Sequence, residues 1–221
     1  MKLKNKILRI TCDGGAATGK STGARLIAKK YKMAFLSSGL LYRYVSYLIL
    51  KYKPKNKINF INKKFKNLNY KKLNKINLHT QKISTESANF AKVLGIRNIL
   101  KLYQKDFIKK NKLCVLEGRD ASTKILPSSD VKFFFICNLN TAAKRRFKEL
   151  KKKSKKISFI EVKRALYKRD VSDKTRSISP LQKHPDAIVV NTTKYGKGVM
   201  IAYMSKYVEK FLKKKIWQLK N

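Results

Sequence analysis

The sequence predicts an α/β fold in which a five-stranded parallel sheet is covered by helices on both faces. Along the 221 residues, five short apolar segments alternate with segments of helical periodicity, and this alternation is typical of a parallel sheet. A glycine-rich loop also lies between the first apolar segment and the first helical one, the order found in nucleotide-binding α/β proteins. We expect one domain over residues 1–221.

The first predicted strand, residues 7–12, leads into a loop with defined spacing. Its residues are Gly14, Gly15, Ala16, Ala17, Thr18, Gly19, Lys20, Ser21 and Thr22. Gly14 and Gly19 let backbone N–H groups approach phosphate oxygens closely, and the helix start that follows favours an anion. We expect Lys20 to be exposed on the loop and to reach the β- and γ-phosphates, while the Ser21 hydroxyl binds Mg²⁺. The sequence therefore predicts a nucleotide-phosphate site.

The second predicted strand, residues 33–36, is followed by a helix for which Ser37 or Ser38 is the N-cap. Tyr42 and Arg43 fall in its first turn. A cation is unfavourable at a helix start, so we expect an anion near Arg43.

The next segment, residues 51–82, consists of Lys and Asn with scattered apolar residues. It predicts a peripheral insertion with weak structure of its own. Helical spacing returns over residues 84–110, with an interruption at Gly95, and Arg97 lies within this stretch.

The third predicted strand, residues 112–116, leads into Glu117, Gly118, Arg119 and Asp120. Charged side chains at the carboxyl end of a strand lie where ligands bind in open α/β sheets. The fourth strand, residues 131–139, is apolar almost throughout, as expected of a strand covered on both faces.

In the helix that follows the fourth strand, Asn140 is the expected cap, and Arg145 and Arg146 lie within the helix. Residues 151–157 form a basic run without apolar periodicity, which we expect to be exposed and mobile.

Ser158 and Glu161 have the spacing of a capping box and predict the start of another helix. If this helix continues, Arg169, Asp173 and Arg176 share one face. A solvated charge row explains that pattern equally well. The fifth strand, residues 186–191, and a C-terminal helix complete the fold.

The net charge of +43 raises the hypothesis of nucleic-acid binding. The lysines, however, are spread over the whole chain together with abundant Asn and Ile, a mixture typical of A/T-rich codon usage. Only ten of the 55 basic residues are arginine, so an arginine in this chain indicates a need for a planar, bidentate donor. They are Arg9, Arg25, Arg43, Arg97, Arg119, Arg145, Arg146, Arg164, Arg169 and Arg176.

The chain has no apolar run of the length that crosses a membrane. Its three cysteines show no metal-binding spacing and fall in or beside predicted strands, which indicates reduced, buried thiols and a cytoplasmic protein.

With these elements placed, the chain resembles the bacterial cytidylate kinase (CMP kinase) family along nearly its whole length. Four motifs carry the resemblance, in the family's order. They are the loop at residues 14–22, the segment from Ser38 to Arg43, the triplet Gly118, Arg119 and Asp120, and the segment from Arg169 to Arg176 with its following Pro180 and Leu181.

The resemblance implies a role for each matching residue. Arg97, Asp120 and Arg176 would recognise cytosine, and Arg169 and Asp173 would hold the ribose hydroxyls. Arg43 and Arg119 would bind the acceptor phosphate, with Ser38 and Tyr42 beside it. Arg145 and Arg146 would face the phosphates that are exchanged. The residues predicted to be catalytic are thus Lys20, Arg119, Arg145 and Arg146.

The resemblance also implies a nucleotide-binding insertion at about residues 51–89 and a lid at about residues 151–176. The expected ligands are ATP, CMP or dCMP, and Mg²⁺, and we expect a monomer. The chain departs from the family at Gly15, where Pro is usual, and at Ser37, where Asp is usual. Ser87 is the nearest candidate for the family's base-contacting Ser near Arg97.

Two other functions remain open at this point. One is another small P-loop kinase, acting on AMP, dTMP or shikimate. The other is a basic RNA-binding protein with a vestigial loop, for which the association would be weak and sensitive to salt.

Overall fold

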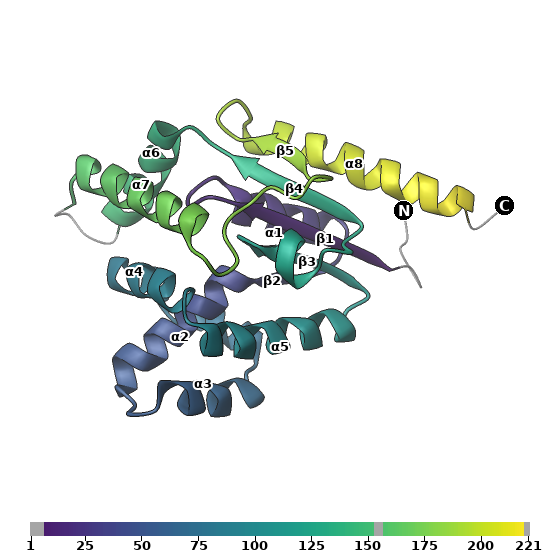
Figure 1. The fold of residues 1–221 in the computed structure, drawn as a ribbon. Coiled ribbons are helices and arrows are strands. Elements are labelled where there is room, and N and C mark those ends of the chain that lie inside the picture. Colours follow the sequence, from purple (N-terminus) through teal and green to yellow (C-terminus); the bar gives the residue numbers. More distant parts are fainter. Residues whose placement is uncertain (1–6, 153–156, 219–221) are drawn as a thin grey trace.

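In the computed structural model, which describes residues 7–152 and 157–218, five strands form one parallel sheet in the order β2-β3-β1-β4-β5 (Figure 1). The predicted fold class is confirmed. The strands are β1 (Leu8–Gly14), β2 (Ala34–Ser37), β3 (Leu113–Gly118), β4 (Val131–Ile136) and β5 (Ile188–Asn191).

Eight α-helices surround the sheet in the described part of the chain. They are α1 (Lys20–Lys30), α2 (Ser38–Tyr52), α3 (Lys57–Lys66), α4 (Gln81–Phe90), α5 (Leu94–Lys110), α6 (Leu139–Lys151), α7 (Phe159–Thr175) and α8 (Lys197–Gln218). Two short helices add to these, the 3₁₀ helix η1 (Tyr70–Lys75) and the π-helical turn η2 (Ala121–Ile125).

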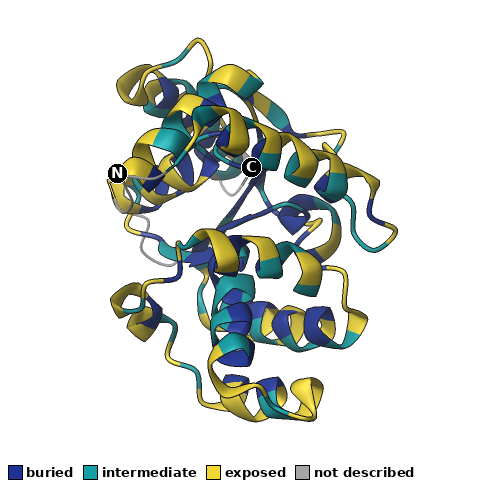
Figure 2. Ribbon diagram, turned by 90° about the vertical axis from the view of Figure 1, so that its left-hand side faces the viewer, coloured by how far each residue is buried: buried dark blue, intermediate teal, exposed yellow. Residues whose placement is uncertain are grey.

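Both faces of the sheet are covered because the strands carry apolar side chains on both faces. On one face, Ile10 of β1 and Phe133 of β4 are fully buried against α1 and α8. On the other face, Leu116 of β3 is buried against α5 and η2. Figure 2 shows buried residues on the strands and on the inward sides of the helices, and exposed residues on the outside.

The lysine-rich segment after α2 is more ordered than its composition predicts. It forms α3 and η1, whose apolar residues Ile61, Phe65 and Leu73 are buried against α2 and α5 in a second hydrophobic cluster. The prediction of weak structure for residues 51–82 was therefore wrong. A few apolar residues at helical spacing are enough to stabilise these helices, because α2 and α5 offer an apolar surface against which they pack.

The predicted interruption of the helical stretch 84–110 is confirmed, but it lies at residues 91–93 and not at Gly95. Helix α4 ends at Phe90 and α5 begins at Leu94, so Gly95 lies within the first turn of α5. A Cβ atom added to Gly95 would lie 2.8 Å from Cδ1 of Ile58. The glycine thus permits close packing of α5 on α3 and does not interrupt the helix.

The predicted helix caps meet three different outcomes. Ser37 caps α2 as expected, since its Oγ accepts the Leu40 N–H at 3.3 Å. Helix α6 begins one residue before Asn140, and its cap is Asn138, which accepts the Asn140 N–H at 2.8 Å. Ser158 is the N-cap residue of α7, but its side chain makes no capping hydrogen bond. The prediction from the capping box was therefore correct for the start of α7 and wrong for the hydrogen bond of the Ser158 side chain.

The remaining expectations concern the basic segment at residues 151–157, the cysteine thiols and the absence of a membrane-spanning helix. Lys151 and Lys152 are exposed as predicted, and residues 153–156 lie outside the described part of the chain. The three cysteines are free, with Cys12 and Cys114 buried. Over the described ranges, no helix combines the length and the apolar character needed to cross a membrane.

Candidate active site

A cavity of about 850 Å³ opens at the carboxyl ends of β1 and β3. It is lined by the glycine-rich loop and by α2, α4, α6 and α7. It therefore lies between α2 and α4 on one side and α6 and α7 on the other. A smaller cavity of about 40 Å³ adjoins it and shares the side chain of Arg119. Ligands bind in this position of open α/β sheets.

The loop after β1 is held in shape by backbone geometry and short hydrogen bonds. Gly14 has a φ of 151°, and a Cβ atom there would lie 2.5 Å from the carbonyl oxygen of Phe135. Gly19, with a φ of 83°, is the N-cap residue of α1. The Thr18 hydroxyl donates to the Gly15 carbonyl at 3.1 Å, and the Thr192 hydroxyl donates to the Thr18 carbonyl at 2.6 Å. The loop is therefore pre-shaped for an anion.

Lys20 is the first residue of α1, and its side chain folds back over the loop. Its Nζ donates to the Gly15 carbonyl at 3.0 Å and lies 3.4 Å from Oε1 of Glu117. The residue is only 5% exposed, so the expectation of an exposed lysine was wrong. Burial, reinforced by the charge of Arg119, lowers the pKa of Lys20 to about 8.

Glu117, at the end of β3, was not among the predicted site residues although it lies beside Lys20. Its Oε2 accepts the Ser37 hydroxyl at 2.5 Å. Burial alone would raise the pKa of Glu117, but the charge of Lys20 and the Ser37 hydrogen bond outweigh it and keep the pKa low. The signal that could have found Glu117 is its place at the carboxyl end of a buried strand, next to the strand that carries the loop.

The oxygen atoms near the loop fit a magnesium ion. The Ser21 hydroxyl and the Glu117 carboxylate are hard ligands of the kind that Mg²⁺ prefers, and Ser21 contributes, after Lys20, Ser37 and Arg119, to lowering the pKa of Glu117. Within the described ranges no cluster of three His, Cys, Asp or Glu residues could hold a metal. Mg²⁺ does not need one, because it usually binds one or two protein oxygens together with phosphate and water.

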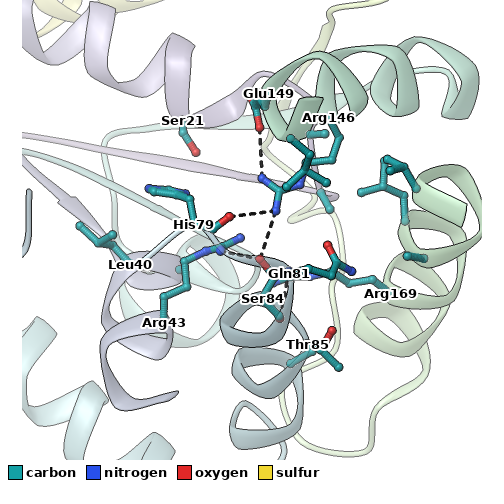
Figure 3. A pocket seen from close by; sticks show the side chains of 18 of the residues that line it. Ser21, Leu40, Arg43, His79, Gln81, Ser84, Thr85, Arg146, Glu149 and Arg169 are labelled. Carbon is teal, nitrogen blue, oxygen red and sulfur yellow. Dashed lines mark hydrogen bonds and ion pairs between the residues drawn. The ribbon is translucent and has the colours of Figure 1, made fainter. Parts of the chain in front are cut away.

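Three arginines converge on the Ser84 residue of α4 within the large cavity (Figure 3). Arg43 and Arg146 donate to the Ser84 hydroxyl at 2.6 and 3.2 Å, and Arg169 donates to its carbonyl at 3.3 Å. Burial and the neighbouring guanidinium groups lower the pKa of Arg43. Three like charges held this closely favour an anion between them.

A second set of arginines surrounds the carboxylate of Asp173. Its Oδ2 accepts from Arg119 Nε at 2.8 Å and lies 3.9 Å from Arg169 Nε, while Oδ1 lies 3.6 Å from Arg176 Nη1. Burial would raise the pKa of Asp173, but the charges of Arg119 and Arg169 outweigh it and lower the pKa. Asp173 is 4% exposed. These residues are therefore a buried ion-pair network and not a solvated charge row.

The smaller cavity is lined by polar groups from four elements. Asp120 and Tyr42 contribute to this lining. Arg97 of α5 does not line the cavity but forms an ion pair with Asp120, and the Tyr42 ring lies 5.8 Å from the Arg97 guanidinium carbon. Ser87 and Arg176 complete the lining together with Ser38, whose hydroxyl donates to Gln104. Burial raises the pKa of Tyr42 to about 12. The side chains of this lining offer the hydrogen-bond donors and acceptors that would recognise the edge of a heterocycle.

Comparison with known proteins decides the family. The sequence model of the family described as Cytidylate kinase matches residues 10–210. The chain belongs to the cytidylate kinase family. Cytidylate kinase from Clostridium tetani is 35% identical over 211 residues, which cover 90% of this chain and 93% of that protein. Cytidylate kinase from Fusobacterium nucleatum is also 35% identical, covering 91% of this chain and 97% of that one.

Solved structures support the fold. Shikimate kinase from Bacteroides thetaiotaomicron aligns with a TM-score of 0.51 and 9% identity, covering 92% of this chain and 99% of that chain. At this identity the likeness shows a shared P-loop kinase fold. It says nothing of the acceptor that this chain uses.

Of the arginines that the resemblance to cytidylate kinases singled out, two line neither cavity in the described structure. Arg97 pairs with Asp120 beside the smaller cavity without lining it. Arg145 donates to the hydroxyl and the carbonyl of Thr192 at 2.9 and 2.6 Å, and it lines neither cavity in the described structure. Arg146 lines the large cavity. The structure therefore brings Arg146 to the cavity and leaves Arg145 against the carboxyl end of β5, behind the loop.

Proposed function

We propose that this protein transfers the γ-phosphate of ATP to CMP, and to dCMP as a second substrate, giving CDP or dCDP and ADP. The observation that carries the proposal is the pair of adjoining cavities. A cation-lined cavity beside the glycine-rich loop has room for phosphates, and the smaller pocket next to it presents the side chains of Ser38, Asp120 and Arg176, which can bind a base by hydrogen bonds.

On the donor side, the loop residues from Gly14 to Thr22 bind the ATP phosphates through backbone N–H groups. Lys20 holds the β- and γ-phosphates from its buried position at 3.0 Å from the loop carbonyl of Gly15. Ser21 and Glu117 would hold Mg²⁺, which would neutralise the charge that develops on the phosphate oxygens during transfer.

On the acceptor side, Arg43 and Arg119 bind the phosphate of CMP, and Arg146 faces the phosphoryl group in transfer. Arg169 and Asp173 hold the ribose hydroxyls. Arg97, Asp120 and Arg176 recognise cytosine, with the Asp120 carboxylate as the natural acceptor for its exocyclic amino group. No side-chain nucleophile is needed, because phosphoryl transfer mainly requires two aligned nucleotides and charge neutralisation.

Helix α7 (Phe159–Thr175) forms the described part of the lid in this proposal. Burial of the Arg119–Asp173 pair beneath α7 supports a closed arrangement in which water is kept from the phosphoryl group. The segment of residues 51–89 forms the acceptor-binding insertion. The chain acts as a cytoplasmic monomer.

A coupled assay for ADP tests the proposal with AMP, CMP, dCMP, UMP, dTMP and shikimate as acceptors. We expect CMP and dCMP to be phosphorylated well and UMP poorly. Preference for AMP, dTMP or shikimate would contradict the proposal.

The RNA-binding alternative is tested by adding tRNA to the same assay at about 0.15 M salt, where exposed charges more than ~8 Å apart are largely screened. We expect no inhibition. Strong inhibition that disappears as salt rises would show that the lysines guide polyanions into the cavity.

A further inference from the structure

Asp170 is the one acidic residue of the described α7 segment that contacts the phosphate loop directly. Its Oδ1 accepts the backbone N–H of Ala16 at 2.9 Å, although the two residues are 154 positions apart in the sequence. A Cβ atom added to Gly15 would lie 3.0 and 3.1 Å from the two carboxylate oxygens. The carboxylate thus lies directly over the second and third residues of the loop.

An apolar contact joins the same two elements beside this hydrogen bond. The side chain of Ala16 is buried in a cluster with Val162 and Leu166 of α7 and Ala143 of α6. The loop therefore meets α7 at one residue by two independent interactions, one polar and one apolar. This is the packing expected where two elements have a fixed relative position.

The contact leaves the nucleotide space free. Among the described residues that line the two cavities, Asp170 does not occur, whereas its neighbour Arg169 lines both. Successive helical side chains point about 100° apart. One helix can therefore hold Arg169 and Asp173 toward the acceptor cavity and Asp170 toward the loop.

We propose that Asp170 is a positioning residue that fixes α7 on the phosphate loop and so holds Arg169 and Asp173 over the acceptor nucleotide. A hydrogen bond from a backbone N–H to a carboxylate is stronger than one between neutral groups, which suits a contact between two separate elements. Gly15 is part of this contact between α7 and the loop, because a larger residue at this position would push against the Asp170 carboxylate.

The inference rests on the proposed function, and a double-mutant cycle tests it. Asp170→Ala removes the acceptor, and Gly15→Ala displaces it from the opposite side. Gly15 is not among the residues with positive φ, so an alanine can adopt its backbone conformation. We expect each variant to lower kcat/KM for CMP at least tenfold, with a raised KM for CMP and KM for ATP within threefold of the wild type.

The double variant decides whether the two residues act through one contact. We expect its kcat/KM to equal that of the weaker single variant within twofold. Asp170→Asn keeps an oxygen that can accept the Ala16 N–H, and we expect it to recover activity to within threefold of the wild type. Glu161→Ala, an exposed acidic position on the same helix, is the matched control and should leave activity unchanged.

Hydrogen exchange of the Ala16 amide, measured without nucleotides, provides a readout that does not depend on CMP being the substrate. We expect exchange to be at least tenfold faster in Asp170→Ala and within threefold of the wild type in Asp170→Asn. Independent, multiplying effects in the cycle, or unchanged exchange, would overturn the inference while wild-type CMP phosphorylation left the proposed function standing. Tighter ATP binding with undiminished kcat in Asp170→Ala would also overturn it, since the carboxylate would then be a competitor of phosphate.

Discussion

The donor side of the cavity is formed mainly by backbone groups, whereas the acceptor side is formed mainly by charged side chains. The donor side is one continuous stretch of chain whose shape is set by glycine backbones and by hydroxyls that donate to its own carbonyls. The acceptor side is made of charged side chains from α2, α5, α7 and the residues after β3. The ion pairs Arg97–Asp120 and Arg119–Asp173 join residues 23 and 54 positions apart in the sequence.

This difference has an energetic consequence. The backbone cradle already has its shape, and the groups that would exchange partners there are the Ala16 N–H and the Lys20 ammonium. The paired side chains of the acceptor side must themselves exchange partners, since Asp120 and Asp173 already bind arginines. A substitution on the donor side should therefore reduce the rate of transfer, whereas one on the acceptor side should mainly change affinity and selectivity. Four predictions test this distinction.

The largest effect is expected from Lys20→Ala on the donor side. Loss of a group that stabilises the transferring phosphoryl group typically costs ~2.7–4 kcal/mol, so we expect kcat to fall by about 100- to 1000-fold with KM for CMP nearly unchanged. The substitution also removes the buried counter-charge of Glu117. Circular dichroism and the melting temperature of the variant should therefore be measured together with its kinetics, to show that it is folded. Lys29→Ala, at an exposed position in the last turn of α1, is the control. Retention of more than about a tenth of the wild-type kcat would contradict the assignment.

Asp120→Ala tests selectivity on the acceptor side. A buried polar group left unpaired costs ~1–3 kcal/mol, so KM for CMP should rise about five- to 150-fold while KM for ATP stays within threefold. The ratio of CMP to UMP activity should fall. Asp106→Ala breaks an exposed pair with Lys110 on the same helix as Arg97 and should have no effect. An equal loss for CMP and UMP would place Asp120 at the sugar or phosphate.

Arg169→Lys keeps the positive charge and removes only the planar fork. A surface ion pair worth ~0–1 kcal/mol would hardly respond, but an ammonium cannot reproduce a bidentate contact. We expect kcat/KM for CMP to fall about tenfold, a loss of about 1.4 kcal/mol. Arg164→Lys, at an exposed position of α7, should change it less than threefold. Equal, small effects at both positions would refute the idea that arginine marks this site.

The smallest effect is expected from pH. Lys20 must be protonated to attract phosphate, and its pKa in the nucleotide-free protein is lowered to about 8. The protonated fraction, and with it kcat/KM for ATP, should therefore fall about twofold between pH 7 and pH 8 and continue to fall above that. The measurement is a pH profile of kcat/KM for ATP at saturating CMP. A flat profile to pH 9 would show that Lys20 keeps its ordinary pKa.

The same contrast explains how much could be predicted from the sequence. The phosphate loop is contiguous, so its residues and the strand and helix around it could be identified by spacing alone. The acceptor residues could be named only through the resemblance to a family, because no local pattern brings Arg97 to Asp120. Glu117, Ser84 and Asp170 were missed for that reason, since each acquires its partner only through tertiary folding.

Two errors have more local causes. Helix α3 was missed because lysines obscure the few apolar residues that anchor it, and packing against α2 and α5 overrides composition. The burial of Lys20 was missed because the loop motif says nothing of β3, whose Glu117 lies beside the lysine only once the sheet has formed.

The order of the strands also determines when the phosphate loop can exist during protein synthesis. Leu8 of β1 pairs with Leu113, and Gly14 packs against Phe135 of β4. The Thr18 carbonyl accepts a hydrogen bond from the hydroxyl of Thr192, which lies 174 positions later in the sequence. The phosphate loop therefore leaves the ribosome well before its native partners in β3, β4 and Thr192, and non-local pairing of this kind is slow to form. We expect a nascent chain to have no ATP-binding loop until β5 has emerged.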